Sequence, residues 1–379
     1  MICDPCTLCL NTELRWWRHQ IEDTLAAPTM QLLLLCLLYF VAASYEQETG
    51  AAPKVIPLEA LKLTGQALVD YVNKQNSFKA TYSPERTKFI MSRLMRKDFM
   101  EKARALRANR TFLEMPVDLA NVPLPERFDA RDAWPNCPSI TYIRDQSACG
   151  SCWAVSAAET ISDRICIHSK GKIKMIASDT DILACCGDQC GYGCEGGYPI
   201  EAWRYVKRNG VCSGGRYGTK DACKPYAIHP CGKHVNETYY GECPNDVWPT
   251  PACKNKCQPG YKTPYRKDKI YAKSAYYVRP IEKQIQYEIM TRGPVQAGFD
   301  VYEDFTSYTS GIYEHLAGEQ VGGHAVKIIG WGEEDGKKYW IIANSWNTDW
   351  GEDHGYFRMI RGVNDCNLES EIVGGIMDV

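Results

Sequence analysis

The chain has 379 residues, which is more than one hydrophobic core usually serves, so we expect at least two packing units together with removable segments. Apolar residues make up 45% of it and charged residues 24%, as is typical of a soluble globular protein. The formal net charge of −2 argues against a protein that binds nucleic acid or another polyanion.

The 19 cysteines are the exception to this ordinary composition, because 14 of them lie between Cys137 and Cys257. Such density favours an oxidising compartment in which disulfide bonds persist. The total is odd, so at least one thiol should be unpaired. A zinc-binding module built on neighbouring cysteines is the alternative, although the chain lacks the usual paired knuckles. Its ligands would be Cys185, Cys186, Cys190 and Cys194.

The N-terminal 44 residues resemble a targeting segment. Residues 31–43 form an apolar run that is too short to span a bilayer but suits the core of a signal peptide. We therefore predict a signal peptide over 30–44, cleaved after Ser44, and no stable membrane anchor. Residues 1–29 make a poor signal n-region, so they are either an extension upstream of an initiator at Met30 or an unusually long n-region.

Residues 45–123 contain no cysteine and are rich in basic residues, Met and Leu. Within them, 85–108 has helical spacing of its apolar positions, so we expect this segment to be partly helical. These positions are Met91, Met95, Phe99, Ala103 and Leu106. We interpret 45–123 as a basic propeptide that blocks a site in the rest of the chain until it is removed near Leu124. The alternative is a small helical domain that stays attached.

Residues 124–379 have a different character, rich in Gly, Trp, Tyr and Cys. The spacing in 153–167 predicts an amphipathic helix, whose apolar face would hold Ala154, Ala158, Ile161 and Ile165. Residues 324–330, 339–346 and 355–361 read as strands bounded by glycines. Early helices and late strands predict an α+β protein of two units with a cleft between them.

The segment Gln146-Ser-Ala-Cys-Gly-Ser-Cys152-Trp153 carries the first chemical signal. Cys152 stands at the expected first turn of the helix, where the partial positive charge of the helix N-terminus favours a thiolate nucleophile. A structural disulfide is the alternative for Cys152. Gln146 can donate its side-chain amide to an oxyanion beside the Cys152 N–H.

A base and its orienting group are expected in the C-terminal part. His324 follows two glycines that allow close approach of a substrate or of the helix. Asn344 stands at the end of a hydrophobic strand, where its carbonyl oxygen can orient the imidazole of His324. Trp346 can shield that hydrogen bond from water.

These motifs resemble those of the papain-like cysteine peptidases and, within them, the cathepsin B group, from about residue 57 to the C-terminus. The resemblance implies a disulfide-rich, two-domain fold, with a helical left domain, a β-barrel-like right domain and a cleft between them. It implies peptide-bond hydrolysis through an acyl-thioester on Cys152, as an endopeptidase with possible peptidyl-dipeptidase activity. It implies an inactive precursor and no cofactor or metal.

The separation of 172 residues between Cys152 and His324 exceeds the general pattern of about 130–150. The surplus falls where the cathepsin B group carries its occluding loop, which residues 231–243 resemble. Two adjacent histidines of that loop capture the substrate's C-terminal carboxylate. This chain has His234 at the second position but Lys233 at the first, which puts the loop's pH-dependent latch to Asp145 in doubt.

Further positions match the family pattern. Gly196 and Gly197 correspond to glycines that hydrogen-bond the substrate backbone, and Glu371 to the carboxylate at the bottom of the main specificity pocket. Departures stand close to the nucleophile, at Ser147, Ala148 and Val155, and none removes a catalytic group. Residues 339–352 resemble a pattern of cathepsin B-like enzymes of blood-feeding helminths.

The resemblance also implies a set of disulfides. The pairs are Cys137–Cys166, Cys149–Cys194, Cys185–Cys253, Cys186–Cys190, Cys223–Cys257 and Cys231–Cys243. Cys152, Cys366 and an extra Cys212 are left over, and the sequence leaves the state of Cys212 open.

The sequence and the resemblance also indicate the setting of the protein. Asn109 and Asn236 are glycosylation sequons, the second inside the loop-like segment. We expect protein and peptide substrates, the chain's own propeptide and cystatin-type inhibitors as partners, a monomeric state, and a lysosomal or extracellular location such as a gut lumen. A papain-like fold that only binds, without catalysis, is the rival hypothesis.

Overall fold

The computed structural model describes residues 55–105, 112–113, 119 and 122–379, which belong to one unit, Val55–Val379. The predicted extension 1–29, the predicted signal peptide 30–44, Leu106 and the sequon at Asn109 lie outside the described residues. No helix in the described part is long and apolar enough to cross a bilayer.

Four helices and one strand come from residues 55–105, which we call the N-terminal segment. They are α3 (Leu58–Leu61), α4 (Gly65–Lys74), β1 (Phe78–Ala80), α5 (Pro84–Met91) and α6 (Lys97–Ala105). The helical spacing noted over 85–108 is confirmed in α5 and α6, but the two helices are separated by residues 92–96. The chain leaves the helix after Met91 because the backbone of Met95 pairs with Gly323 instead, through N–H···O bonds of 2.8 and 3.0 Å.

The remaining helices belong to residues 124–379, which we call the peptidase domain. The α-helices are α7 (Ala130–Ala133), α8 (Cys152–His168), α9 (Asp179–Cys185), α10 (Pro199–Asn209), α11 (Glu282–Arg292) and α12 (Glu303–Thr306). The 3₁₀-helices are η3 (Gly187–Cys190), η4 (Gly193–Glu195), η5 (Tyr265–Lys267) and η6 (Asp365–Glu371).

The strands form a sheet in the order β1-β5-β8-β7-β6-β4-β9-β3, with β2 paired to β6. The strands of the peptidase domain are β2 (Phe128–Asp129), β3 (Tyr276–Tyr277), β4 (Val295–Tyr302), β5 (Tyr308–Tyr313), β6 (Gln320–Glu334), β7 (Lys337–Ala343), β8 (Tyr356–Ile360) and β9 (Ile372–Gly374). The three strands predicted from sequence correspond to β6, β7 and β8. All pairs are antiparallel except β5 with β8. Strand β1 of the N-terminal segment adds to the edge at β5, where Phe78 pairs with Gly311.

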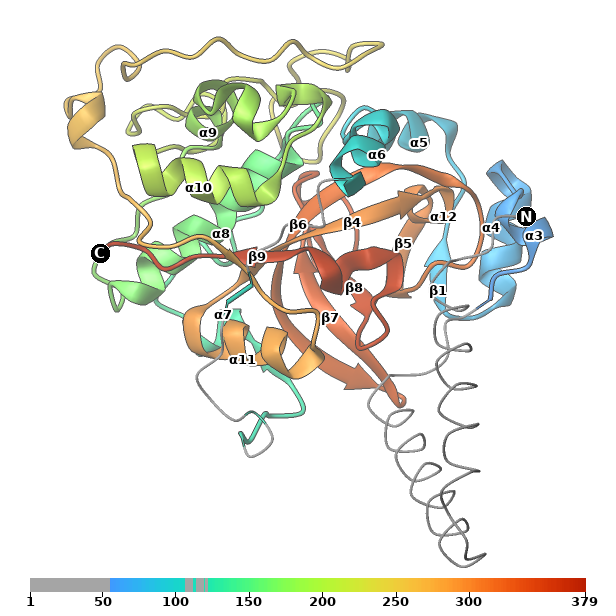
Figure 1. Cartoon of the computed structure of the whole chain (residues 1–379). Coiled ribbons are helices and arrows are strands. Elements are labelled where there is room, and N and C mark those ends of the chain that lie inside the picture. Colours follow the sequence, from blue (N-terminus) through green and yellow to red (C-terminus); the bar gives the residue numbers. More distant parts are fainter. Residues whose placement is uncertain (1–54, 106–111, 114–118, 120–121) are drawn as a thin grey trace, which may run out of the picture. The chain divides into compact units, whose positions relative to one another are not determined.

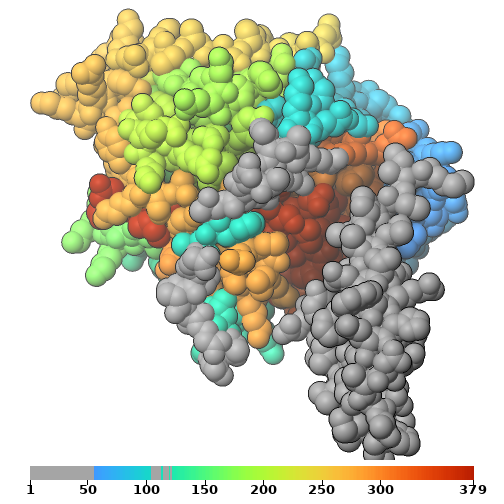
Figure 2. Space-filling view, viewed as in Figure 1, coloured from blue at the N-terminus to red at the C-terminus, as the bar shows by residue number. Residues whose placement is uncertain are grey.

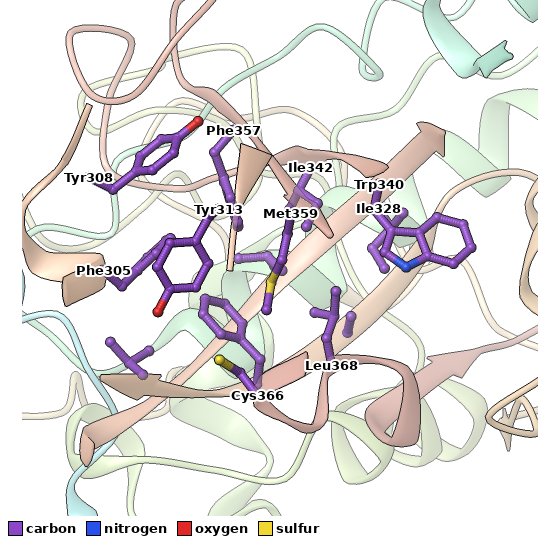
Figure 3. Close-up of a cluster of buried hydrophobic side chains, with 14 of the residues drawn as sticks. Phe305, Tyr308, Tyr313, Ile328, Trp340, Ile342, Phe357, Met359, Cys366 and Leu368 are labelled. Atoms are coloured by element: carbon purple, nitrogen blue, oxygen red, sulfur yellow. The ribbon is translucent and has the colours of Figure 1, made fainter. Parts of the chain in front are cut away.

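Two large hydrophobic clusters support these elements. The first lies on the sheet and is rich in aromatic side chains, among them Phe305, Tyr313 and Phe357, which are fully buried (Figure 3). Phe305 packs edge-on against Phe357 with ring centroids 5.2 Å apart, a favourable aromatic geometry. The second cluster surrounds α8 and includes residues of α9 and α10.

Helix α8 is buried on every side, because α9 and α10 cover one face and the strands β4 and β6 the other (Figure 1). Every residue from Cys152 to Cys166 is buried, so the amphipathic pattern predicted for this helix is wrong. Some of its buried polar groups, such as Arg164, are paired with other elements. Arg164 forms an ion pair of 3.0 Å with Glu288 of α11 and donates to the carbonyl of Pro294 at 2.8 Å. A charge placed there without such partners would be strongly destabilising.

Two buried carboxylates of α8, Asp163 and Glu159, differ in their partners. Lys327 of β6 forms a buried ion pair of 2.9 Å with Asp163. Glu159, one helical turn earlier and 2% exposed, has no hydrogen-bond partner for either carboxylate oxygen among the described residues. Burial raises the pKa of Glu159 to about 7, although Lys327 and Arg144 act in the opposite direction.

We expect the free energy of unfolding of the Glu159→Gln variant to fall less between acidic and neutral pH than that of the unchanged protein. The pKa of this carboxyl is 4.5 in an ordinary environment and about 7 in the fold. Between these values the unfolded chain has already released the proton that the folded chain still holds. The free energy of unfolding therefore falls as pH rises, by about 3 kcal/mol over the window. A glutamine does not titrate, so the variant should keep this stability.

Denaturant unfolding with the disulfides intact, at about pH 4 and about pH 8, measures the difference. Glu126→Gln, at an exposed position, is the matched control and should behave like the unchanged protein. Equal pH dependence in Glu159→Gln and the unchanged protein would contradict the expectation.

Candidate active site

Cys152 is the first residue of α8 and is completely buried. Its helix N-terminus favours a thiolate, but burial has the larger effect and raises the pKa of the thiol to about 12. Backbone hydrogen bonds, the first of them from Ala325, lower the pKa by less. Ala325 follows His324 in β6, so the first turn of α8 meets the strand at the candidate base.

His324 is held between an amide and an indole. Its Nε2 lies 2.7 Å from Oδ1 of Asn344, and its ring stacks on Trp346 with centroids 4.5 Å apart. The Asn344 oxygen also accepts from the N–H of Ser345 at 2.8 Å, which fixes the amide. Burial lowers the pKa of His324 to about 4, and the hydrogen bond to Asn344 offsets only part of this shift. The other ring nitrogen, Nδ1, has no hydrogen-bond partner in the described part of the chain.

Gln146 faces a carbonyl group of the N-terminal segment. Its Nε2 donates to the backbone oxygen of Arg93 at 2.8 Å and to that of Cys149 at 2.7 Å. Its Oε1 accepts from the hydroxyl of Ser345 at 2.8 Å, which orients the amide. The sequence reasoning missed Ser345, because only the fold brings this residue next to Gln146.

The N-terminal segment continues along the site after Arg93. Met95 pairs with Gly323, and the N–H of Arg96 donates to the carbonyl of Glu195 at 3.1 Å. A Cβ atom on Gly322 would lie 2.6 Å from the carbonyl oxygen of Met95. The glycines before His324 thus allow close approach of a peptide segment, here the N-terminal one. Figure 2 shows α5 and α6, in cyan, between the green and orange surfaces of the peptidase domain.

Glu371 lines a cavity of about 80 Å³ together with Gly298 and Tyr277 of the peptidase domain. Met95, Phe99 and Met100 of the N-terminal segment line the same cavity, which leaves little free space. The ring of Phe99 lies over Gly196, where a Cβ would come within 2.7 Å of it.

The backbones of Gly196 and Gly197 pair with other residues of their own loop. The carbonyl of Gly196 accepts from the N–H of Tyr192 at 2.8 Å, and Gly197 pairs with Gly191. In the same loop, the carbonyl of the neighbouring Glu195 accepts a hydrogen bond from the N–H of Arg96 in the N-terminal segment.

His234 in the 231–243 segment faces two carboxylates. Its Nδ1 lies 3.1 Å from Asp349 and its Nε2 3.2 Å from Asp145, and its side chain is only 4% exposed. Burial acts to lower the pKa of His234, but the hydrogen bond to Asp349 and the charges of Asp145 and Asp349 outweigh it, so the pKa is raised. The sequence reasoning named Asp145 and missed Asp349. Lys233 and Asn236 are exposed.

Among the described residues there are six disulfides, and they are the pairs that the family resemblance implies. Cys185, Cys186, Cys190 and Cys194 all belong to these disulfides, so the alternative of a zinc module at these residues is wrong. Cys152, Cys212 and Cys366 are free and buried.

Residues 124–376 match the papain family of cysteine proteases. The chain belongs to this family. Two cathepsin B-like cysteine proteinases of Haemonchus contortus, numbered 1 and 2, are 52% and 50% identical to it. Each match covers 92% of this chain and 99% of the relative. Procathepsin B S9 from Trypanosoma congolense is 33% identical, with a TM-score of 0.67, and the match covers 84% of this chain and 99% of that structure. The chain is therefore a cysteine peptidase similar to cathepsin B-like enzymes.

We expect alkylation of Cys152 to be at least tenfold slower in the unprocessed peptidase than after removal of the N-terminal segment. The thiol is buried, its pKa is raised to about 12, and the pKa of His324 is lowered to about 4, so little thiolate is present. Labelling with iodoacetamide followed by mass spectrometry of the Cys152 peptide gives the two rates. The variant Cys152→Ser corrects for Cys212 and Cys366. Equal rates before and after processing would contradict the expectation.

Proposed function

We propose that the protein is made as an inactive precursor, with residues 45–123 as the propeptide, and that residues 124–379 then hydrolyse peptide bonds. The observation that carries this proposal is the backbone carbonyl of Arg93, which accepts from the Gln146 amide 2.8 Å away. A peptide chain already occupies the place that a substrate needs, with its carbonyl oxygen where an oxyanion would form.

The residues act in the following order. The sulfur of Cys152 transfers its proton to Nδ1 of His324 and attacks the substrate carbonyl, while Gln146 and the Cys152 N–H bind the oxyanion. Protonated His324 gives the proton to the leaving amine, and the acyl group stays on sulfur as a thioester. Water, deprotonated by His324, then releases the carboxylic acid and restores Cys152. Asn344 keeps the imidazole in this orientation, and Trp346 excludes water from their hydrogen bond.

Departure of the propeptide changes the electrostatics of this site. Water then reaches Cys152 and His324, so the burial that now favours their neutral forms is reduced. A thiolate and an imidazolium can form side by side, each stabilising the other, and the helix N-terminus supports the thiolate.

We propose that the 231–243 segment closes one end of the cleft and that the enzyme also removes C-terminal dipeptides. Both ring nitrogens of His234 are engaged by carboxylates. The neighbouring exposed Lys233 is therefore our choice for the cation that receives the substrate's C-terminal carboxylate. It lines a cavity of about 490 Å³ with His234 and Trp350.

We place the enzyme in the secretory pathway, in a lysosome or outside the cell, as a monomer that cystatin-type inhibitors can block. The six disulfides among the described residues support passage through an oxidising compartment, where such bonds persist. The buried Glu159 supports an acidic destination, because stability falls as pH rises from 4.5 to about 7. Asn236 is exposed and available for a glycan.

We expect Cys152→Ala to abolish turnover while the protein still folds and is processed by added pepsin. The test compares cleavage of an internal Arg-Arg reporter peptide with release of C-terminal dipeptides, at mildly acidic pH with and without an epoxide thiol inhibitor. Inhibitor-sensitive dipeptide release supports the role of the loop, and internal cleavage alone would refute that role. Residual activity of Cys152→Ala in a clean preparation would refute the nucleophile, and inactivity of the unchanged enzyme in both assays would refute catalysis.

We expect Glu371→Ala to lower kcat/KM about tenfold for peptides with Arg at the second residue before the scissile bond, and much less for peptides with Phe there. A carboxylate in the cavity pairs with the guanidinium, whereas a phenyl ring needs only the apolar walls. Steady-state kinetics with the two peptides measures this. Equal losses would mean that Glu371 does not contact this side chain.

A further inference from the structure

Cys212 is the extra cysteine whose state the sequence leaves open, and the structure places it beside a disulfide. The side chain is fully buried, and its sulfur lies within 4.8 Å of the sulfur of Cys223. Cys223 is bonded to Cys257. A free thiol therefore stands next to one sulfur of a disulfide, which is the arrangement from which thiol–disulfide exchange starts.

Backbone contacts hold the thiol and this sulfur close together. The residue after Cys212 is Ser213, whose hydroxyl accepts from the N–H of Cys223 at 2.8 Å. The N–H and the hydroxyl of Ser213 both donate to the carboxylate of Asp268, at 2.7 and 2.6 Å. The short distance between Cys212 and Cys223 is thus fixed by hydrogen bonds and does not depend on a chance side-chain position.

The disulfide lines a cavity of about 590 Å³ on its other side. Three lysines line the same cavity, and they are Lys224, Lys254 and Lys256. Positive charge favours a thiolate, so these lysines favour the departure of the Cys257 sulfur from the disulfide. The carbonyl oxygen of Thr263 lies 3.4 Å from that sulfur, where it can accept the proton of a released thiol.

The chain around Cys257 is also held by contacts other than the disulfide. The N–H of the next residue, Gln258, donates to the carbonyl of Cys223 at 2.8 Å. The side-chain amide of Gln258 donates to the carbonyls of Thr219 and Ala222 at 2.8 and 2.6 Å. Loss of the bond between the two sulfurs therefore leaves the segment anchored, and only a local movement is needed.

We infer that Cys212 and the Cys223–Cys257 disulfide form a thiol–disulfide exchange site. The thiolate of Cys212 attacks the sulfur of Cys223, the bond from Cys223 to Cys257 breaks, and its electron pair leaves with the sulfur of Cys257. Cys212 gives its proton to water, and Cys257 takes one up. One disulfide replaces another, so the step needs no oxidant or reductant. The product has a Cys212–Cys223 bond and a free thiol at Cys257, which lines the basic cavity and is accessible to thiol reagents there.

The surroundings of Cys212 make the exchange dependent on pH, because the attacking group must be a thiolate. The ionisable groups around it are Asp181, Tyr205, Lys224, Asp268 and Lys269. Burial has the largest effect and raises the pKa of the Cys212 thiol, the two carboxylates add to this, and the two lysines oppose it. Both lysines are also paired with Asp181, at 2.6 Å each. The rate should therefore be very low in acid and rise about tenfold per pH unit while the pH stays below the pKa of the thiol.

The test uses the precursor with the substitution Cys152→Ala, purified at about pH 5 so that little thiolate is present. After transfer to about pH 8, the exchange is stopped with acid, and free thiols are labelled with N-ethylmaleimide in denaturant. Mass spectrometry of the digest should then show a Cys212–Cys223 link and labelled Cys257. Both should appear about a hundredfold faster at about pH 8 than at about pH 6. Their rate should not depend on protein concentration, because the step is intramolecular.

Two further variants separate this site from other thiols. Cys212→Ser removes the attacking sulfur and should leave Cys257 unlabelled at both pH values. Cys366→Ser removes another free, buried thiol and should change nothing. Exclusive pairing of Cys223 with Cys257 at about pH 8, or equal labelling of Cys257 with and without Cys212, would overturn the exchange site. The first of these outcomes needs no variant of Cys212, so the test decides even where Cys212→Ser does not fold. The result is also independent of the proposed peptidase function, because the protein tested lacks the Cys152 thiol.

Discussion

The contact between the first turn of α8 and strand β6 is the constraint on which the site depends. Cys152 begins the helix, and Ala325, which bonds to its sulfur, follows His324 in the strand. The helix cannot shift easily, because it is buried on all sides and Arg164 ties it to Glu288 and to the carbonyl of Pro294. Cys152 and His324, which come from distant parts of the sequence, are thus held together by the core rather than by flexible loops.

The same packing carries an electrostatic penalty. Burial that fixes the geometry also favours the neutral thiol and the neutral imidazole, since a charge loses its hydration there. While the N-terminal segment covers the site, the helix N-terminus alone does not compensate for this loss. Under the proposed function, the segment inhibits in two ways: it occupies the peptide path through Arg93 and Met95, and it keeps water from Cys152 and His324.

Short sequence motifs were enough to predict the candidate site residues. Residues that reach the site only through long-range contacts could not be predicted. The segment around Cys152 and the strand ending at Asn344 could be read from the sequence, because each short stretch combines a reactive group with the element that places it. Ser345 contacts Gln146, 199 residues away in the chain, and Asp349 contacts His234, 115 residues away. No periodicity or motif reports such partners.

The differences between the predicted and observed elements have the same physical origin. Helical spacing over 85–108 is real on both sides of the break, yet backbone pairing of Met95 with Gly323 replaces helical hydrogen bonds at the point where the segment crosses the site. Likewise, the apolar positions of α8 predicted one buried face, but polar residues such as Asp163 are buried as well because partners such as Lys327 lie on β6. Periodicity describes one element in isolation and cannot count the elements that cover it.

The net charge of the whole chain does not describe the charges around the candidate site. A net charge of −2 suggests no electrostatic role, but the sign varies over short distances along the cleft. Asp145 lies 3.9 Å from Arg93 of the N-terminal segment and 3.2 Å from His234 of the 231–243 segment. One carboxylate therefore faces a cation of the N-terminal segment, which leaves if that segment is the proposed propeptide, and a cation of the peptidase domain. Removal of Arg93 takes away a competing positive charge, which strengthens the hold of Asp145 on protonated His234. Under the proposed function, the step that opens the site to substrate thus also tightens the contact that holds the 231–243 segment.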